Sequence, residues 1–182
     1  TGNCRIENNT VLQNTTPMES ISFDVAGDFD LGSYAGINAN VSELKANRIR
    51  FLGYYANINA DSLGYRGGGN SGNASFNGEG PGGGTYASPD GSGHSCGGGG
   101  GHGGAGGTCN RAGGTGGAQN GTQAAPSAFG SGGAAAHAIN AVGGNGGGFI
   151  KIVVNDFIGT NYSEIRAQGQ NAGAYFDSVG GG

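Results

Sequence analysis

The sequence predicts an all-β protein, a parallel β-helix-like solenoid with a glycine-rich insertion of the polyglycine II type and almost no α-helix. Short segments with period-two alternation and β-branched residues lie on both sides of a long glycine-rich segment. About three-quarters of the 45 glycines fall between residues 64 and 148. No segment keeps the 3.6-residue period of a helix for three turns.

We expect four parts along the chain. Residues 1–19 form a polar N-terminal lead-in, and residues 20–63 hold solenoid coils. Residues 64–148 form the insertion, and residues 149–182 return to solenoid coils that continue into a next glycine tract. Only 35% of the 182 residues are hydrophobic and 11% are charged. Stability must therefore come from backbone hydrogen bonds and small apolar stacks instead of a large core.

The strand-forming segments share a pattern. Three of them have the form Ile-polar-Ala, at residues 37–39, 58–60 and 165–167. Ile21 precedes Ile37 by 16 residues, and short strands at near-constant spacing indicate stacked coils. Alanine at the inward positions indicates a narrow interior. A small β-sandwich with irregular hairpins is the alternative. The predicted strands lie at residues 20–25, 37–44, 49–51, 58–63, 149–154 and 165–167.

The insertion has a period of three. Gly-Gly-x triplets run from residue 100 to 108 and resume at residues 113–118. A polyproline II helix has three residues per turn, so His102, Ala105 and Thr108 would point outward. The glycine faces would then approach until backbone groups bond between neighbouring helices, with Cα–H···O contacts in addition. A disordered glycine linker is the alternative.

The cysteines predict a disulfide in the insertion. Cys96 and Cys109 bracket the most glycine-dense tract, and a bond between them would stabilise the fold by about 3 kcal/mol. Cys4 is then unpaired or forms an intermolecular disulfide. A zinc cluster of these two cysteines with His94 and His102 is the alternative, but the spacing fits no common zinc motif. We expect no metal site and no cofactor.

Few features indicate catalysis or other partners. Asp24, Asp28 and Asp30 could bind calcium, but no EF-hand or calcium-binding repeat is present, and a solvated strand edge is the favoured interpretation. No glycosidase carboxylate pair, nucleophile elbow or phosphate loop stands out, so we expect no catalytic residues and no enzyme activity. The net charge of −4 and the lack of a basic patch disfavour nucleic acid. No apolar run approaches the ~20 residues of a membrane span.

The glycosylation sequons predict an extracellular or cell-surface glycoprotein. Roughly two or three Asn-x-Ser/Thr sequons would be expected by chance. The chain begins at Thr1 without a visible targeting segment, so we expect that a signal peptide has been removed. The alternative is an unglycosylated bacterial or phage protein with an Asn/Ser/Thr-rich surface. The six sequons lie at Asn8, Asn14, Asn40, Asn73, Asn120 and Asn161.

These elements together resemble the glycine-rich repeats of large extracellular surface proteins. An Ile-x-Ala strand at residues 58–60 leads into Leu-Gly-Tyr-Arg-Gly-Gly-Gly at 63–69. The chain returns through Gly-Gly-Gly and an apolar strand at 146–154 to a further Ile-x-Ala at 165–167. The resemblance covers about residues 56–171 and implies a β-solenoid with a polyglycine II insert in surface, matrix or fibre contexts. The glycine bundle also resembles those of springtail antifreeze proteins and phage tail-tip adhesins.

We therefore expect a structural glycoprotein, a subunit or repeat of a surface fibre, appendage or matrix. Copies or neighbouring repeats would assemble head to tail through open solenoid ends. The alternative is an adhesin or glycan-binding module that presents loops of the glycine bundle, such as residues 85–94. Antifreeze activity comes third and depends on the short series of Thr108 and Thr115. The seven tyrosines lie mostly at predicted strand ends, where packing against the glycine bundle is favoured over stacking on sugars.

Overall fold

The chain folds into two compact units. The sheet unit comprises Thr1–Ala60 and Ile150–Ala167, and the glycine unit comprises Asp61–Phe149 and Gln168–Gly182. All ten strands belong to the sheet unit, and the described residues contain no helix, which confirms the predicted all-β class. The structure, a computed structural model, describes residues 2–69, 76–87, 95–109, 113–122, 127–136 and 141–172.

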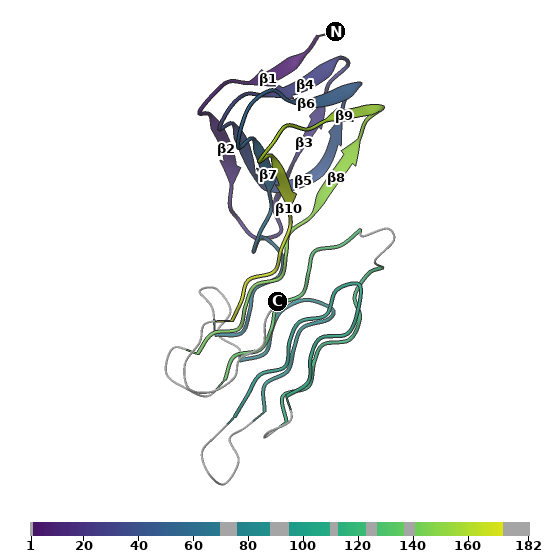
Figure 1. The fold of residues 1–182 in the computed structure, drawn as a ribbon. Helices are drawn as coiled ribbons and strands as arrows, with labels where there is room; N and C mark the ends of the chain where they lie inside the picture. Colours follow the sequence, from purple (N-terminus) through teal and green to yellow (C-terminus); the bar gives the residue numbers. More distant parts are fainter. Residues whose placement is uncertain are drawn as a thin grey trace. The chain divides into compact units, whose positions relative to one another are not determined.

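The strands of the sheet unit pair in parallel (Figure 1). Sheet A contains β1 (Cys4–Ile6), β4 (Asp28–Leu31), β6 (Arg48–Phe51) and β9 (Asp156–Ile158), in that order. Sheet B contains β10 (Glu164–Arg166), β7 (Asn57–Asn59), β5 (Gly36–Lys45) and β2 (Val11–Asn14), in that order. In sheet C, β5 pairs with β3 (Ser20–Asp24) and with β8 (Ile150–Val153).

The chain visits the three sheets in a repeating order. We call one passage through sheets A, B and C a circuit. The first circuit consists of β1, β2 and β3. The second consists of β4 in sheet A and the long strand β5, which belongs first to sheet B and then to sheet C. Cys4 pairs with Phe29, Asp28 pairs with Arg48, and Arg48 pairs with Asp156, so the successive circuits take 25, 20 and 108 residues. The third circuit is long because it contains residues Asp61–Phe149 of the glycine unit. The 16 residues from Ile21 to Ile37 therefore lead from sheet C through sheet A to sheet B and are shorter than a circuit.

One apolar row runs across sheet B. Leu12, Ile37, Ile58 and Ile165 are Cα partners in four neighbouring strands. Ile37 and Ile58 have no exposed surface. The three Ile-polar-Ala segments of the sequence are thus neighbours in one sheet. The core of the sheet unit contains Ile6, Phe29, Leu31, Ala35, Ile37, Ala39, Val41, Leu44, Ala46, Ile49, Phe51, Ala56 and Ile58.

Four strands occur where the sequence analysis predicts none, namely β1, β2, β4 and β9. Residues 1–19 are thus not only a polar lead-in, because β1 and β2 form there. β1, β2 and β9 each lie at the end of a sheet with one neighbouring strand, and their exposed residues include polar ones as well as apolar ones such as Leu12 and Phe157. In β4 the charged residues Asp28 and Asp30 are buried against arginines of β6, which conceals the strand pattern.

The glycine unit consists of extended segments that bond to one another through their backbones. Tyr65 N and Gly68 N donate to Gly130 O and Gly133 O at 3.0 and 2.9 Å. This step of three residues differs from the two-residue step of a β-strand. Three more pairs of bonds show the same spacing, in which backbone N–H donors three residues apart bond to carbonyl oxygens three residues apart. These are Gly98 and Gly101 N to Thr85 and Gly82 O, Gly130 and Gly133 N to Gly147 and Gly144 O, and Gly143 and Gly146 N to Gly68 and Tyr65 O.

Residues 130–136 form the middle of the glycine unit, and all of them are buried. A Cβ atom on Gly132 would overlap the carbonyl oxygen of Arg66. The absence of a side chain at Gly132 allows this segment and the segment of Arg66 to approach closely enough to bond. The middle segment exchanges backbone hydrogen bonds with residues in the segments 65–68, 76–79, 82–85, 98–101 and 144–147.

The Gly-Gly-x triplets place their third residue at the surface. Gly114 and Gly117 are buried, whereas the third residues of the triplets are exposed. This arrangement agrees with the outward direction predicted from the period of three. The exposed third residues are His102, Ala105, Thr108, Thr115 and Ala118.

Candidate functional site: the open sheet edges and the predicted site residues

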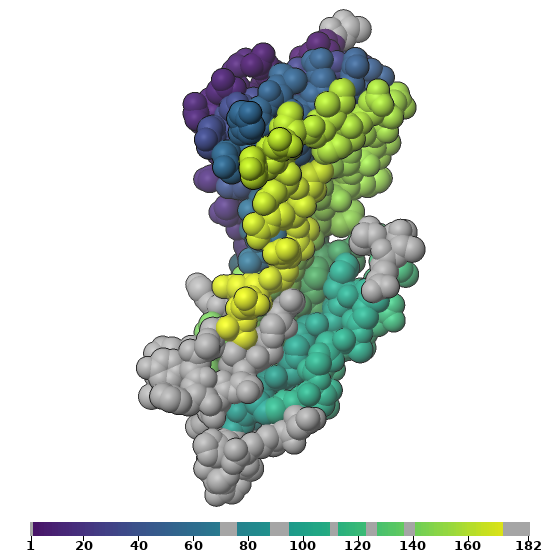
Figure 2. Space-filling view, in the orientation of Figure 1, coloured from purple at the N-terminus to yellow at the C-terminus, as the bar shows by residue number. Residues whose placement is uncertain are grey.

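Sheets A and B are open at both ends in the part of the chain that the structure describes. β1 and β2 lie at one end, and β9 and β10 lie at the other. Figure 2 shows the side chains of the C-terminal strands, in yellow-green, at the surface of the sheet unit. An edge strand presents backbone N–H and C=O groups that a further strand can pair with.

The apolar rows of the interior end with exposed side chains at these strands. In sheet B, Leu12 and Ile165 are 40% and 42% exposed, although the two isoleucines between them are fully buried. In sheet A, Phe157 is 48% exposed, whereas its partner Ile49 is fully buried. These side chains occupy interior positions and are exposed because no further strand covers them.

The acidic cluster is paired with arginines. Arg50 donates from Nε and Nη2 to the two carboxylate oxygens of Asp30, both at 2.7 Å. Arg48 lies 3.2 Å from Asp28, and its hydrogen bond holds the pKa of Asp28 below the ordinary value of 3.8. The hydrogen bond to Asp30 likewise raises the pKa of Arg50. Asp28 and Asp30 therefore join β4 to β6, while Asp24 lies apart from them in β3.

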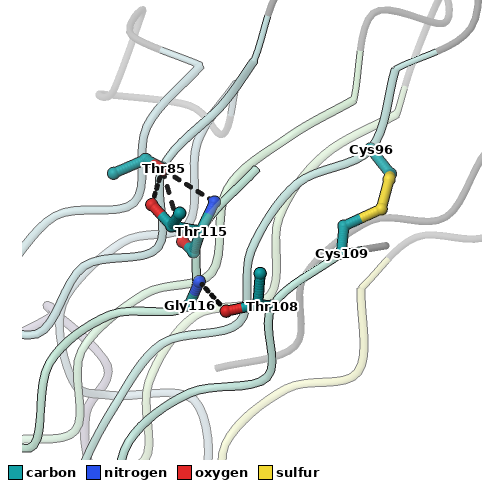
Figure 3. The surroundings of a disulfide bond; sticks show 6 residues. All are labelled: Thr85, Cys96, Thr108, Cys109, Thr115 and Gly116. Carbon is teal, nitrogen blue, oxygen red and sulfur yellow. Dashed lines mark hydrogen bonds between the residues drawn. A yellow bond between two sulfur atoms is a disulfide. The ribbon is translucent and has the colours of Figure 1, made fainter. Parts of the chain in front are cut away.

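The predicted disulfide between Cys96 and Cys109 is present in the glycine unit (Figure 3). The Cα atoms of the two cysteines are 6.1 Å apart, and 13 residues separate them in the sequence. Cys96 is buried, and Cys109 N donates to Gly114 O at 2.9 Å. The disulfide thus connects two segments of the bundle, one of which also bonds to a third.

Threonines on neighbouring segments bind one another near the disulfide (Figure 3). The hydroxyls of Thr85 and Thr115 are 2.5 Å apart, and Thr115 N donates to Thr85 Oγ1 at 2.9 Å. Gly116 N donates to Thr108 Oγ1 at 3.1 Å. The Thr108 and Thr115 series, which motivated the antifreeze alternative, is therefore part of a local network that joins segments.

The structure describes five of the six sequon asparagines. Asn8 and Asn161 are exposed, and Asn14 and Asn120 are partly buried. Asn73 lies outside the described residues. Among the five described asparagines, Asn8 and Asn161 are the positions at which the folded chain leaves room for a glycan.

Asn40 is the sequon asparagine that does not fit this pattern. It lies in β5 and is fully buried, and its Nδ2 donates to Glu19 O at 3.0 Å. A glycan on that nitrogen would need space that the core lacks. The alternation of the predicted strand does not indicate this burial, because Asn40 lies between the inward residues Ala39 and Val41 and is expected on the opposite face.

The remaining predicted residues form no shared site in the described part of the chain. Cys4 is partly buried in β1 and has a free thiol. His94 of the zinc alternative lies outside the described residues, as do residues 88–94 of the predicted glycan-contacting loop. Within the described ranges, no group of three or more His, Cys, Asp or Glu residues could hold a metal ion.

Comparisons with known proteins assign no function to the chain. No protein-family model, curated protein or solved structure matches the chain. None of the described segments is a helix long and apolar enough to cross a membrane.

Proposed function

We propose that the chain is a structural extracellular glycoprotein, a subunit or repeat of a surface fibre, appendage or matrix. In this proposal the sheet unit is a β-solenoid and the glycine unit is a polyglycine II bundle. Copies or neighbouring repeats extend the solenoid by stacking head to tail through the open ends of the sheets. N-linked glycans are attached at the exposed sequons of the resulting fibre.

The order of the strands supports the solenoid. All strand pairs are parallel, and each circuit of the chain visits sheets A, B and C in turn. Interior rows such as Ile37 and Ile58 repeat from one circuit to the next. A winding in which each coil contacts only its neighbours can be extended without changing its cross-section.

The three-residue step of the backbone hydrogen bonds supports the polyglycine II bundle. A helix with three residues per turn presents the same face to a neighbour at every third residue. The bond pairs from Tyr65 and Gly68 to Gly130 and Gly133 have that spacing. Buried glycines on the contacting faces and exposed third residues in the triplets agree with the same geometry.

The exposed apolar side chains at the ends of the interior rows support the assembly proposal. Covering a half-exposed Leu, Ile or Phe side chain contributes about 1 kcal/mol, and Leu12, Phe157 and Ile165 are each in that condition. A strand added to an open edge also makes main-chain hydrogen bonds. A second copy placed with its first circuit against the last circuit of this one satisfies both requirements.

The extracellular location rests on two features. Disulfides persist in oxidising compartments, and Cys96 is bonded to Cys109. Exposed sequons such as those at Asn8 and Asn161 are the acceptors for N-linked glycans in secreted proteins.

The assembly is tested by sedimentation and electron microscopy of the purified chain over a range of concentrations. We expect linear oligomers that grow with concentration. Leu12→Glu or Ile165→Glu should abolish them, because each change places a charge in an apolar row at an open end. Leu52→Glu is the matched control, since Leu52 is 45% exposed but follows β6 inside sheet A. Dispersed monomers at every concentration would overturn the assembly proposal.

A further inference from the structure

Three exposed tyrosines form a ladder beside sheet B. The ring centroids of Tyr34 and Tyr55 are 5.3 Å apart with planes at 25°, and those of Tyr55 and Tyr162 are 5.3 Å apart at 20°. The three side chains are 55%, 49% and 68% exposed. Each tyrosine precedes a strand of sheet B by two residues. They stack on one another, which the sequence analysis did not predict.

The backbone at these tyrosines is unusual. Tyr34, Tyr55 and Tyr162 have φ values of 56°, 58° and 64°, in the left-handed region that bulky L-residues disfavour. Asn9 holds the equivalent place in the first circuit with φ of 59° and has no ring. Since asparagine is well tolerated in this conformation, the turn before each strand of sheet B does not itself require tyrosine. Repeated use of a disfavoured residue indicates a function for the ring.

The ladder borders a groove of about 400 Å³ on the outer face of sheet B. Asn38, Asn57 and Asn59 of β5 and β7 line it, together with two of the tyrosines. Asn38 and Asn59 are Cα partners, and they alternate along their strands with the buried isoleucines. An amide side chain has both hydrogen-bond donors and an acceptor, and Asn57 Nδ2 donates to Tyr55 O at 3.4 Å. The groove thus combines an aromatic border with a polar floor.

The charges of the groove cancel. Glu164 and Arg166 of β10 line it and form an ion pair at 3.5 Å. A groove without net charge, in a chain of net charge −4, gives no attraction to phosphate or nucleic acid. The chemistry favours a neutral ligand that has both apolar faces and many hydroxyl groups.

We propose that this groove binds an extended neutral oligosaccharide. A pyranose ring presents C–H groups on its faces and hydroxyls around its rim, and an aromatic border with amides is complementary to both. Tyr55 and Tyr162 are the two rings of the ladder that line the groove, and the 5.3 Å between them is close to the length of one sugar residue in an extended chain. Two successive sugars would therefore meet these two rings. The groove lies on the outer face of sheet B and extends to its end strand β10, which contributes Glu164 and Arg166. Head-to-tail assembly adds a strand at the edge of β10, so sugar binding is measured at protein concentrations where the chain is monomeric.

The test uses the full chain produced in bacteria, so that no N-glycan of its own occupies the groove. Two kinds of probe are titrated while tyrosine fluorescence is followed, namely short linear oligomers of glucose or N-acetylglucosamine and an oligomannose N-glycan. We expect saturable binding of at least one probe. Binding of linear oligomers indicates a polysaccharide as the natural source, and binding of oligomannose alone indicates the glycan of a neighbouring glycoprotein.

Two variants locate the site. Tyr162→Asn should weaken binding by about tenfold or more while circular dichroism stays unchanged, because asparagine adopts this backbone conformation at Asn9. Tyr54→Asn is the matched control, since Tyr54 is 59% exposed but does not line the groove. Asn38→Ala should also weaken binding without touching the ladder. Absence of binding to every probe, or equal binding by the wild type and Tyr162→Asn, would overturn the proposal.

Discussion

Individual glycines in the glycine unit differ in what lies against their Cα atoms. A Cβ atom on Gly132 would overlap the carbonyl oxygen of Arg66, and one on Gly67 would overlap that of Gly143. At Gly104 and Gly107, by contrast, the corresponding space is open. Glycine is therefore required sterically on the faces where segments bond and not throughout the tract.

This difference makes a prediction at single residues. Gly132→Ala should lower the free energy of unfolding by about 1–3 kcal/mol or more, because the methyl group must push apart two bonded backbones. Gly107→Ala should leave stability unchanged or raise it by about 0.4–1 kcal/mol, since alanine restricts the unfolded chain. Chemical denaturation of both variants measures the difference. Equal destabilisation by the two changes would contradict the packing described for Gly132.

At the same scale, the sequence identifies some site residues and not others. Cys96 and Cys109 could be predicted because they bracket one glycine tract. The tyrosine ladder could not, because the stacking of Tyr34 on Tyr55 depends on the lengths of the circuits that bring them together. Burial of Asn40 follows only once its strand is known to be covered on that face.

At the scale of elements, the disulfide fixes the two segments that it joins. Each of these segments also bonds to another segment through the backbone, Gly98 N donating to Thr85 O at 3.1 Å and Cys109 N donating to Gly114 O at 2.9 Å. The sulfur bridge limits how far segments without apolar side chains can separate in the unfolded chain. Its contribution to stability is therefore mainly a restriction of the unfolded state.

Removing the disulfide should destabilise the glycine unit. For the double variant Cys96→Ser and Cys109→Ser we expect a loss of about 3 kcal/mol in the free energy of unfolding. Thermal unfolding with and without a reducing agent provides a second measurement, which should affect the wild type and not the variant. Cys4→Ser is the control, because Cys4 is a free thiol. A double variant as stable as the wild type would contradict this role.

The elements themselves could be predicted where their pattern is apolar and repeated. The three Ile-polar-Ala segments are neighbours in sheet B, as their shared form indicates. β4 could not be predicted, because Asp28 and Asp30 replace apolar residues and are neutralised by arginines twenty residues later in the chain. An edge strand such as β1 has one neighbouring strand and is less covered than a central strand, so its sequence is not restricted to a regular apolar pattern.

At the scale of the whole molecule, the backbone N–H and C=O groups form hydrogen bonds in two different ways in one chain. The sheet unit uses parallel strand pairs around a small apolar core. The glycine unit uses hydrogen bonds with a three-residue step, together with a few aromatic contacts such as those of Phe129 with Tyr65 and Phe149. Because neither unit has a large hydrophobic core, the positions that accept a bulky surface group are limited to exposed turns and strand ends.

This limit leads to a prediction about glycosylation of the folded protein. When the chain is secreted by a eukaryotic cell, Asn8 and Asn161 should carry glycans, because both side chains are exposed. Asn40 should be unoccupied, because its side chain is fully buried and bonded to Glu19 O. A chain that received a glycan at Asn40 before folding could not form the contacts of β5 and would be retained or degraded. Glycopeptide mass spectrometry of the secreted material measures the occupancy of each sequon.

Two variants serve as controls for this experiment. Asn161→Gln should remove one glycan and leave the circular dichroism spectrum unchanged. Ser42→Ala destroys the sequon at Asn40 without altering that side chain, and it should leave the glycan mass of the secreted protein the same as in the wild type. Full occupancy of Asn40 in folded, secreted protein would contradict the burial of this residue, and with it the pairing of β5 with β3. Complete absence of glycans at Asn8 and Asn161 would instead contradict the proposed extracellular glycoprotein while leaving the fold intact.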